Sequence, residues 1–272
     1  MKVAVLGYGP AGLIAAKVLV DLGFEVDVIG AGGKSVIGGA QYLHENVMNE
    51  FNTKPEAYIE FLKIGDRDNY ARKVYTRPDV DVSWDHYEGR QGAWALGPVY
   101  DLLWRYFEDN LIHDTFNGLS LAMLEDTKRY DMIFNSIPAH AVCEWPSAHD
   151  FPRVPILLVP WSPVHMNNVV VYSGRPEDAW YRTSTLFGES WTEFGVAQVK
   201  GEYFDTALTG KLEDEGKLLE PVRGFKPLGT NCDCHPGIVR IGRFGLWDRK
   251  VLLHHVPKQV TEALKARHKD EM

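Results

Sequence analysis

The sequence has little cysteine and no long apolar segment. Its 272 residues include three cysteines, an odd number that argues against a disulfide scaffold and favours a reducing compartment. No apolar run reaches the ~18 residues of a membrane span, and no charged-then-apolar leader opens the sequence. We therefore expect a cytoplasmic protein with neither a signal peptide nor a membrane partner.

An excess of basic residues and the common hydrolase signatures are also absent. The 29 Lys and Arg against 37 Asp and Glu give a formal net charge of −8. This balance disfavours a non-specific duplex-DNA surface, because neutralising phosphates needs basic patches, so no nucleic-acid partner is expected. No G-x-S-x-G, H-E-x-x-H or Walker motif supports a hydrolase or a nucleoside triphosphatase. The composition, 45% hydrophobic and 12% aromatic, is that of a globular protein.

The N-terminal residues carry the strongest positive signal. Residues 2–6 form a short apolar run, typical of a parallel strand buried on both faces. Residues 7–12 follow as a complete G-x-G-x-x-G. A helical pattern then ends at Gly23, and residues 25–29 predict a second strand. This order of strand, glycine-rich turn, helix and strand is the context that identifies a dinucleotide-binding βαβ unit.

The glycines of this turn have separate roles in such a unit. Gly7 permits the tight turn, Gly9 lets the backbone approach a pyrophosphate, and Gly12 lets the helix and the strand pack closely. The helix N-terminus presents free N–H groups and a partial positive charge to the phosphates. We therefore predict a dinucleotide pyrophosphate at residues 7–12.

The end of the second strand leaves the dinucleotide open. An acidic residue usually stands there and holds a hydroxyl of the adenosine ribose. Here Gly30 occupies that place, and Lys34 is the first charged side chain after it. Because a lysine favours a ribose 2′-phosphate, an NAD(P)-dependent oxidoreductase is one alternative function. A non-catalytic nucleotide-sensing module is another.

Three separated segments resemble flavoproteins with two dinucleotide-binding regions, namely amine oxidases and UDP-galactopyranose mutase. The first, residues 3–42, contains the glycine-rich turn and a second pair, Gly38 and Gly39. The second, residues 130–138, is a strand that enters Asn-Ser-Ile-Pro, and the third, residues 237–264, contains Gly-Arg-x-Gly before a helix. The resemblance implies a short, divergent FAD-dependent oxidoreductase that acts on a small molecule, amine oxidase-like or sugar-mutase-like. NAD(P)H is then a candidate reductant.

The same resemblance implies the cofactor contacts. In those families both glycine-rich loops hold FAD, and the Gly-Arg-x-Gly segment offers free N–H groups at a helix start near the flavin end. The implied cofactor-binding residues are Gly7, Gly9, Pro10, Ala11, Gly12, Lys34, Gly38, Gly39, Ala40, Gln41, Gly242 and Arg243.

The order of these segments predicts an α/β fold. It consists of a Rossmann-like parallel sheet that binds FAD or NAD(P), with an inserted mixed or antiparallel substrate domain. In the first insertion we expect short strands at residues 69–75 and 80–84. The expected domain bounds are 1–46, 95–145 and 230–272 for the FAD-binding domain, and 47–94 and 146–229 for the inserted regions.

Aromatic residues and arginine in the second insertion suit a pocket for a ring-bearing or anionic ligand. We expect this pocket at the junction of the two domains, where ligand sites commonly form. Its predicted lining is Tyr42, His44, Trp180, Tyr181 and Arg182. His44 is a candidate for proton transfer, and Arg182 for bidentate binding of an anionic group. The alternatives are a histidine bonded to loop backbone and an arginine paired with a surface carboxylate such as Glu177 or Asp178.

The Cys-Asp-Cys-His segment at residues 232–235 is a candidate metal site. It clusters three soft ligands with C-x-C-H rather than C-x-x-C spacing, and no second Cys/His cluster follows it in the sequence. The spacing therefore predicts a loop and no metal site.

Overall fold

The computed structural model describes residues 1–35, 37–38, 41–47, 54–77, 79–195, 212–214, 217–219 and 221–270. The chain forms two compact units, and the second interrupts the first twice in the sequence. Unit 1 comprises Met1–Val36, Leu96–Arg153 and Pro227–Met272, and unit 2 comprises Ile37–Ala95 and Val154–Lys226.

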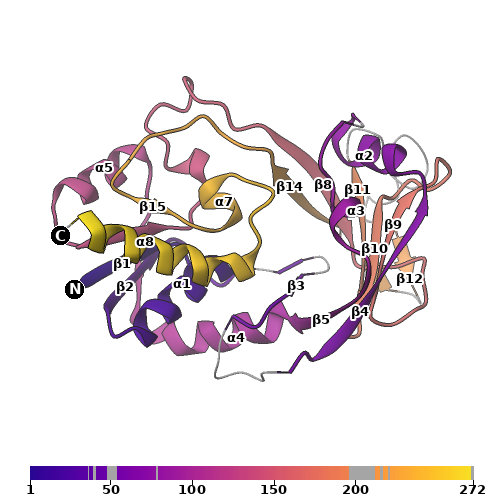
Figure 1. The fold of residues 1–272 in the computed structure, drawn as a ribbon, viewed down its shortest axis with the longest axis horizontal. Coiled ribbons are helices and arrows are strands. Elements are labelled where there is room, and N and C mark those ends of the chain that lie inside the picture. The colour runs from indigo at the N-terminus through magenta and orange to yellow at the C-terminus, as the bar shows by residue number, and fades with distance from the viewer. Residues whose placement is uncertain are drawn as a thin grey trace. The chain divides into compact units, whose positions relative to one another are not determined.

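Unit 1 is built on a five-stranded sheet with the order β15-β7-β1-β2-β6 (Figure 1). Each pair of neighbouring strands is parallel. The strands are β1 (Lys2–Leu6), β2 (Glu25–Gly30), β6 (Leu111–His113), β7 (Met132–Asn135) and β15 (Val239–Arg240). A parallel sheet needs a crossover after each strand and normally buries both of its faces.

Both faces of the central strand β1 are buried. Ala4 and Leu6 pack with Leu121 of α5 in one hydrophobic cluster. Val3 and Val5 point to the opposite face, because side chains alternate along a strand, and they too are fully buried. Helix α1 packs against β1, β2 and β7. The apolar run at residues 2–6 thus forms the expected buried strand.

The helices of unit 1 follow the predicted order. Helix α1 begins at Pro10, as fits a proline at the first helical position, and ends before Gly23, whose φ is +84°. In Figure 1, α8 lies alongside α1, in agreement with the contacts between them. The α-helices are α1 (Pro10–Asp21), α4 (Leu96–Phe107), α5 (Gly118–Asp126), α7 (Gly242–Leu246) and α8 (Val256–Asp270), and the 3-10 helices are η1 (Glu108–Asn110), η2 (Ala139–Ala141) and η3 (Leu253–His255).

Unit 2 contains an eight-stranded mixed sheet with the order β14-β8-β11-β10-β9-β4-β5-β3. Strands β4 and β9 pair in parallel, and the run β8-β11-β10-β9 is antiparallel. The predicted fold class, a parallel dinucleotide-binding sheet with an inserted mixed sheet, is confirmed. The strands are β3 (Tyr42–Leu43), β4 (Ala57–Gly65), β5 (Gly89–Ala95), β8 (Arg153–Val159), β9 (Val169–Gly174), β10 (Arg182–Leu186), β11 (Glu189–Gly195) and β14 (Val222–Pro227), with a separate hairpin of β12 (Leu212–Asp214) and β13 (Lys217–Leu219).

The two short strands predicted in the first insertion are wrong. Residues 69–75 belong to helix α2 (Arg67–Tyr75), and residues 83–86 form the short helix α3 (Ser83–His86). The side chain of Asp66 accepts a hydrogen bond from the Asn69 amide and caps α2. Tyr70, Ala71 and Val74 are buried, a spacing that gives one helix face against the sheet.

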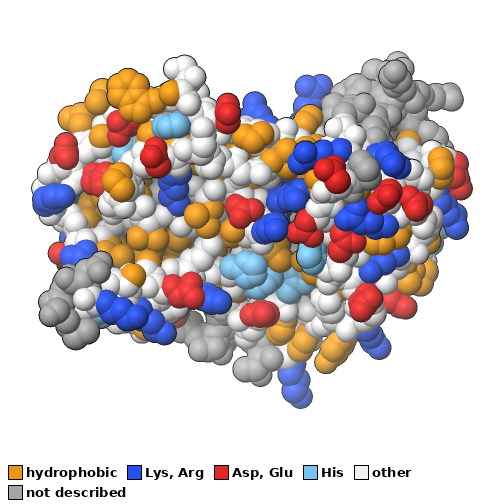
Figure 2. Space-filling model, turned by 45° about the horizontal axis from the view of Figure 1, so that its top comes forward, with side chains coloured by type: hydrophobic (Ala, Val, Ile, Leu, Met, Phe, Trp, Pro, Cys, Tyr) orange, Lys and Arg blue, Asp and Glu red, His pale blue; other side chains and the backbone are white. Residues whose placement is uncertain are grey.

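The surface carries charges of both signs. On the face drawn in Figure 2, acidic and basic side chains are interspersed rather than gathered by sign. In the part of the chain that the structure describes, no helix combines the length and the apolarity that a membrane crossing requires.

Candidate functional site

The carboxyl ends of β1 and β7 define the candidate site of unit 1. From β1 the chain proceeds to β2 and β6 on one side of the sheet, and then returns to β7 and β15 on the other. The order of the strands therefore reverses between β1 and β7. In open α/β sheets, ligands bind outside the carboxyl ends of the strands at such a reversal.

Two glycines of the turn after β1 are required by close packing. Gly7 has φ +104°, a backbone conformation that favours glycine, and its N–H donates to the Ile29 carbonyl at 2.7 Å. A Cβ on Gly12 would lie 2.0 Å from the Gly7 carbonyl oxygen, inside the van der Waals limit. These contacts agree with the roles expected for the first and third glycines of the motif.

Gly9 differs from its neighbours because it faces open space. A Cβ placed on it would meet no atom of the described residues within 4 Å, and its φ of −67° suits other residues as well. Gly9 is the N-cap of α1, where no side chain of the described residues makes a capping bond and no acidic residue stands in the first turn. The space beside Gly9 is thus bordered by helix-terminal N–H groups, with Pro10 and Ala11 opening the helix.

Ser136, at the end of β7, is part of this site and was missed among the predicted site residues. Its hydroxyl donates to the Leu6 carbonyl at 2.8 Å. A Cβ on Gly7 would lie 2.5 Å from that hydroxyl oxygen, and one on Gly12 would lie 2.8 Å from it. Ser136 therefore fills the space that the two glycines leave. The Asn-Ser-Ile-Pro that follows the strand was the available signal.

The Gly-Arg-x-Gly segment reaches the same end of the sheet. Gly242 has φ +68°, and a Cβ on it would lie 2.7 Å from the Cβ of Ala11. Its amide donates to the Gln259 side chain at 2.9 Å, so this N–H is not free as the sequence argument supposed. Arg243 donates through Nε to the Val251 carbonyl at 3.1 Å.

Lys34 is held against α4. Its ammonium forms an ion pair with Asp101 and lies 5.7 Å from the ring centroid of Tyr100. The Tyr100 hydroxyl donates to the Tyr8 carbonyl at 2.8 Å and accepts from the Ser35 amide at 3.0 Å. These contacts fix the chain after β2 to the turn that carries the site.

The second glycine-rich loop is described only in part. Gly39 and Ala40 lie outside the described residues. The Gln41 side-chain amide donates to the Gly38 carbonyl at 2.8 Å. A Cβ on Gly38 would make ordinary contacts with Val222 and Trp191, at 3.6 and 3.8 Å. That this loop holds the cofactor stays a prediction.

In unit 2, Arg182 is paired with a carboxylate that the sequence argument did not consider. Arg182 on β10 lies opposite Glu193 on β11, and Nη2 donates to Oε1 of that residue. The Glu193 side chain is only 3% exposed. Its Oε2 accepts from the Tyr181 hydroxyl at 2.6 Å and lies 3.5 Å from the Lys226 ammonium. The expected surface partners Glu177 and Asp178 are replaced by this buried one.

Tyr181 and Trp180, which precede Arg182 in the sequence, are both engaged within unit 2. Tyr181 is fully buried, and its place in a substrate pocket stays a prediction. The Trp180 carbonyl accepts from the Lys73 ammonium at 3.1 Å. The Nε of Arg182 is buried and has no hydrogen-bond partner among the described residues.

Tyr42 and His44 belong to an aromatic group in unit 2. The ring centroid of His44 is 4.6 Å from that of Tyr42 and 4.8 Å from that of Tyr87, on which it stacks. Burial raises the pKa of Tyr42 well above its usual value, with an added contribution from Tyr172 and an opposing one from Arg182. Tyr42 therefore remains a protonated hydrogen-bond donor at neutral pH.

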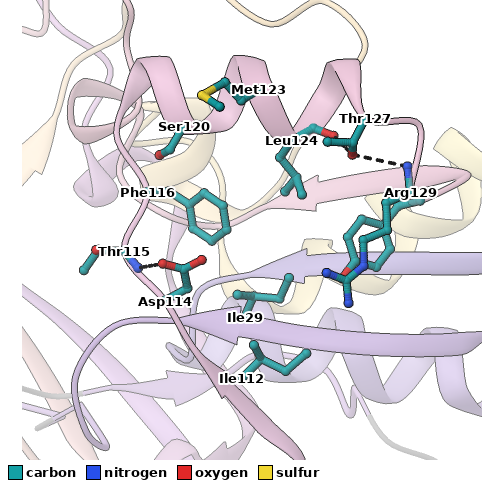
Figure 3. Close-up of a pocket in the computed structure, with 11 residues that line it drawn as sticks. Ile29, Ile112, Asp114, Thr115, Phe116, Ser120, Met123, Leu124, Thr127 and Arg129 are labelled. Atoms are coloured by element: carbon teal, nitrogen blue, oxygen red, sulfur yellow. Dashed lines mark hydrogen bonds between the residues drawn. The ribbon is translucent and has the colours of Figure 1, made fainter.

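A hollow of unit 1 lies between α5 and the strands β2 and β6. Figure 3 shows Ile29 and Ile112 on the strand side, and Met123 and Leu124 on the α5 side. Its volume of ≈ 260 Å³ lies below the ~300–1,000 Å³ usual for a ligand pocket. None of the predicted site residues lines it. We therefore regard the N-terminus of α1 as the candidate site of this unit.

Comparison of the sequence with known proteins identifies no family. No protein-family model matches the chain, and a search of curated proteins finds no match.

Comparison of the structure identifies the fold. The 2,6-dihydroxypyridine-3-hydroxylase from Arthrobacter nicotinovorans is similar with a TM-score of 0.52 and 12% identity, over 96% of this chain and 81% of that one. HpxO from Klebsiella pneumoniae, complexed with FAD and uric acid, is similar with a TM-score of 0.50 and 12% identity, over 96% and 77%. A flavoprotein/dehydrogenase from Cytophaga hutchinsonii has a TM-score of 0.51 and 12% identity, over 98% and 79%. The chain therefore has a fold shared with FAD-binding flavoproteins.

Proposed function

We propose that this protein is a flavoenzyme that binds FAD at the N-terminus of α1 and oxidises a small molecule. The observation that carries the proposal is the open space beside Gly9, where a glycine-rich turn meets a helix end without a side-chain cap at the reversal of a parallel sheet. A pyrophosphate matches that space because it is anionic and can accept hydrogen bonds from several backbone amides.

The residues present fit this cofactor. Gly9 leaves room for a phosphate at the backbone, while Gly7 and Gly12 hold the turn closed beneath it. Gly242 packs against Ala11, so a third segment borders the same helix start. When bound, the flavin ring supplies the two-electron chemistry, and the protein supplies position, charge and exclusion of water.

The ion pair between Lys34 and Asp101 favours FAD over NADP as the bound dinucleotide. A 2′-phosphate site would depend on this lysine, yet its ammonium pairs with Asp101. NAD(P)H keeps its place in the proposal as a reductant that binds transiently.

The substrate class is inferred from the sequence resemblance, the structural neighbours and an aromatic group of unit 2. The resemblance in sequence favours an amine oxidase-like or sugar-mutase-like reaction. Two structural neighbours, one named for a dihydroxypyridine and one complexed with uric acid, favour a planar heteroaromatic substrate and a hydroxylation. The aromatic group of Tyr42, His44 and Tyr87 in unit 2 suits such a ring, because flat surfaces stack. We therefore extend the proposal to small planar heteroaromatic compounds.

The test is the identity of the bound molecule. The full chain should purify yellow, with flavin absorbance in the near ultraviolet and the blue, and release FAD on denaturation as identified by mass spectrometry. Reduction of the bound flavin by NADPH or NADH, faster when heteroaromatic compounds are added, would support the hydroxylase class. A colourless protein that does not take up FAD on reconstitution would refute the proposal.

A further inference from the structure

Three cysteines and one histidine from distant parts of unit 1 meet at one point. Cys143 and His149 lie between β7 and β8, and Cys232 and Cys234 lie between β14 and β15. The three sulfur atoms and the His149 Nδ1 all lie within 4.8 Å of one another. Cys143 and Cys232 are buried, and the His149 side chain is 16% exposed. Cys234 is half-buried, so the cluster is shielded from solvent for the most part.

The distances within the cluster match one tetrahedral ion. Cys143 Sγ lies 3.7 Å from Cys232 Sγ and 3.8 Å from Cys234 Sγ. The His149 Nδ1 lies 3.2 Å from Cys143 Sγ and 3.6 Å from Cys234 Sγ. Zn–S bonds of ~2.3 Å and Zn–N bonds of ~2.0 Å at tetrahedral angles require S···S separations of ~3.8 Å and S···N separations of ~3.5 Å. The three cysteines are free at these separations, because a disulfide requires sulfur atoms ~2.05 Å apart.

The surroundings of the cluster are those of a metal site. Arg240 donates to the Cys232 sulfur at 3.3 Å and to the carbonyls of Cys232 and Cys234 at 2.8 and 2.7 Å. It therefore holds the Cys-x-Cys loop and offsets the charge of thiolate ligands. The other ring nitrogen of His149, Nε2, lies 3.6 Å from the Asp233 carboxylate. A carboxylate beside the second nitrogen is the usual orienting partner of a metal-bound histidine.

His235, the histidine of the sequence motif, is not a ligand. Its Nε2 lies 3.0 Å from the Val142 carbonyl oxygen, and its Nδ1 lies 3.2 Å from the Glu144 carboxylate. The contact with Val142 fastens the Cys-x-Cys loop to the residue before Cys143, whereas Nδ1 makes no hydrogen bond among the described residues. The fourth ligand is His149, which the spacing of residues 232–235 could not reveal.

We propose that Cys143, His149, Cys232 and Cys234 bind one structural Zn²⁺. Three thiolates and an imidazole in tetrahedral arrangement suit this ion, and four protein ligands leave no position for a substrate. The ion links the segment after β7 to the segment before β15, and β7 and β15 are neighbouring strands of the sheet. Its binding therefore stabilises unit 1, because the unfolded chain has no preformed site. This site is independent of the proposed flavin.

The metal content of the full chain is the first test. Protein expressed with added zinc and dialysed without a strong chelator should contain one zinc per chain by plasma mass spectrometry. Chelation should release the zinc and lower the melting temperature, and added Zn²⁺ should restore it. Replacement by Co²⁺ should give thiolate-to-metal charge-transfer bands and the intense visible bands of a tetrahedral site.

Variants test the assignment of the ligands. Cys143→Ser and Cys234→Ser should lose stoichiometric zinc, whereas His165→Ala, at an exposed histidine, should keep it. Asp233→Asn should retain the fold and weaken zinc retention by about tenfold, the usual effect of removing an orienting partner. Reduced wild-type protein that takes up neither Zn²⁺ nor Co²⁺ would refute the proposal, as would a disulfide between Cys143 and either other cysteine in protein purified under nitrogen.

Discussion

The ring of Tyr8 occupies the space that a side chain at position 30 would need. A Cβ on Gly30 would lie 3.1 Å from Cδ1 and 3.2 Å from Cε1 of Tyr8. The ring is held in place because its hydroxyl donates to the Ile112 carbonyl and its edge contacts Trp104 and His113. The absence of the usual acidic residue at the end of β2 thus has a steric cause within the glycine-rich turn itself.

The contact between Tyr8 and position 30 predicts that the effect of Gly30→Ala on the free energy of unfolding changes sign when the Tyr8 ring is removed. Gly30→Ala should lower the free energy of unfolding by about 1 kcal/mol, because overpacking costs more than the glycine entropy that the change recovers. With the ring removed by Tyr8→Ala, the same change should be neutral or stabilising. Tyr8→Phe keeps the ring and should keep the penalty. Urea denaturation of the six combinations of these changes measures the effects, and an equal penalty in every background would contradict the contact.

Gly9→Val should separate cofactor binding from folding. A valine suits the backbone of Gly9, and its Cβ meets no atom of the described residues within 4 Å, so the free energy of unfolding of the apoprotein should change by no more than about 1 kcal/mol. The side chain would fill the space assigned to the pyrophosphate, so the purified variant should be colourless with a normal circular dichroism spectrum. Gly97→Val, at a second glycine with open space, is the matched control and should stay yellow. Full FAD content in Gly9→Val would contradict the site.

The N-terminal βαβ unit of unit 1 could be predicted because its sequence signals are local. Its parts lie close together in the sequence: a strand at residues 2–6, a turn at residues 7–12 and a strand at residues 25–29. Each strand is marked by an apolar run, and the turn is marked by its glycines. One βαβ unit of this kind predicts a parallel sheet, because its right-handed crossover returns the chain to a parallel neighbouring strand.

The side-chain pairings could not be predicted because they depend on long-range register. Arg182 meets Glu193 because β10 and β11 pair at that position, which no local pattern specifies. Cys143 and Cys234 are 91 residues apart, so their approach depends on the folded sheet. The helix Arg67–Tyr75 was missed for a different reason: its cap, Asp66, was not considered, and the alternation of a short apolar pattern was mistaken for a strand.

The buried carboxylate of Glu193 should stabilise unit 2 through its cationic neighbours. Glu193→Gln keeps the shape but removes the counter-charge shared by Arg182 and Lys226, so we expect a loss of about 2–4 kcal/mol in the free energy of unfolding. Adding Arg182→Gln should restore part of this loss. Glu189→Gln, at an exposed position of the same strand, is the control and should cost less than about 0.5 kcal/mol. If Glu193→Gln and Glu189→Gln lowered the free energy of unfolding equally, the buried pair of Glu193 and Arg182 would not be a stabilising element.

The buried ammonium of Lys73 should make the stability rise with pH. It donates to the carbonyls of Ser173, Arg175 and Trp180 at 3.3, 2.6 and 3.1 Å, and burial lowers its pKa to about 8, against an opposing effect of Asp178. Between the folded pKa of about 8 and the unfolded value of 10.5, the unfolded chain binds more protons, so the free energy of unfolding increases with pH.

From pH 7 to pH 9.5 this increase should be about 2 kcal/mol, taking 1.36 kcal/mol for each unit of pKa difference. Urea denaturation of wild type and Lys73→Met at both pH values isolates the contribution, because other titrating groups cancel in the difference. The variant should lack the rise, whereas Lys258→Met, at a lysine whose side chain is 76% exposed, should retain it. The range stops below pH 10 because the buried tyrosines, whose pKa is raised by burial, begin to oppose folding there. An identical pH dependence in wild type and Lys73→Met would mean that the ammonium is solvated in the folded protein.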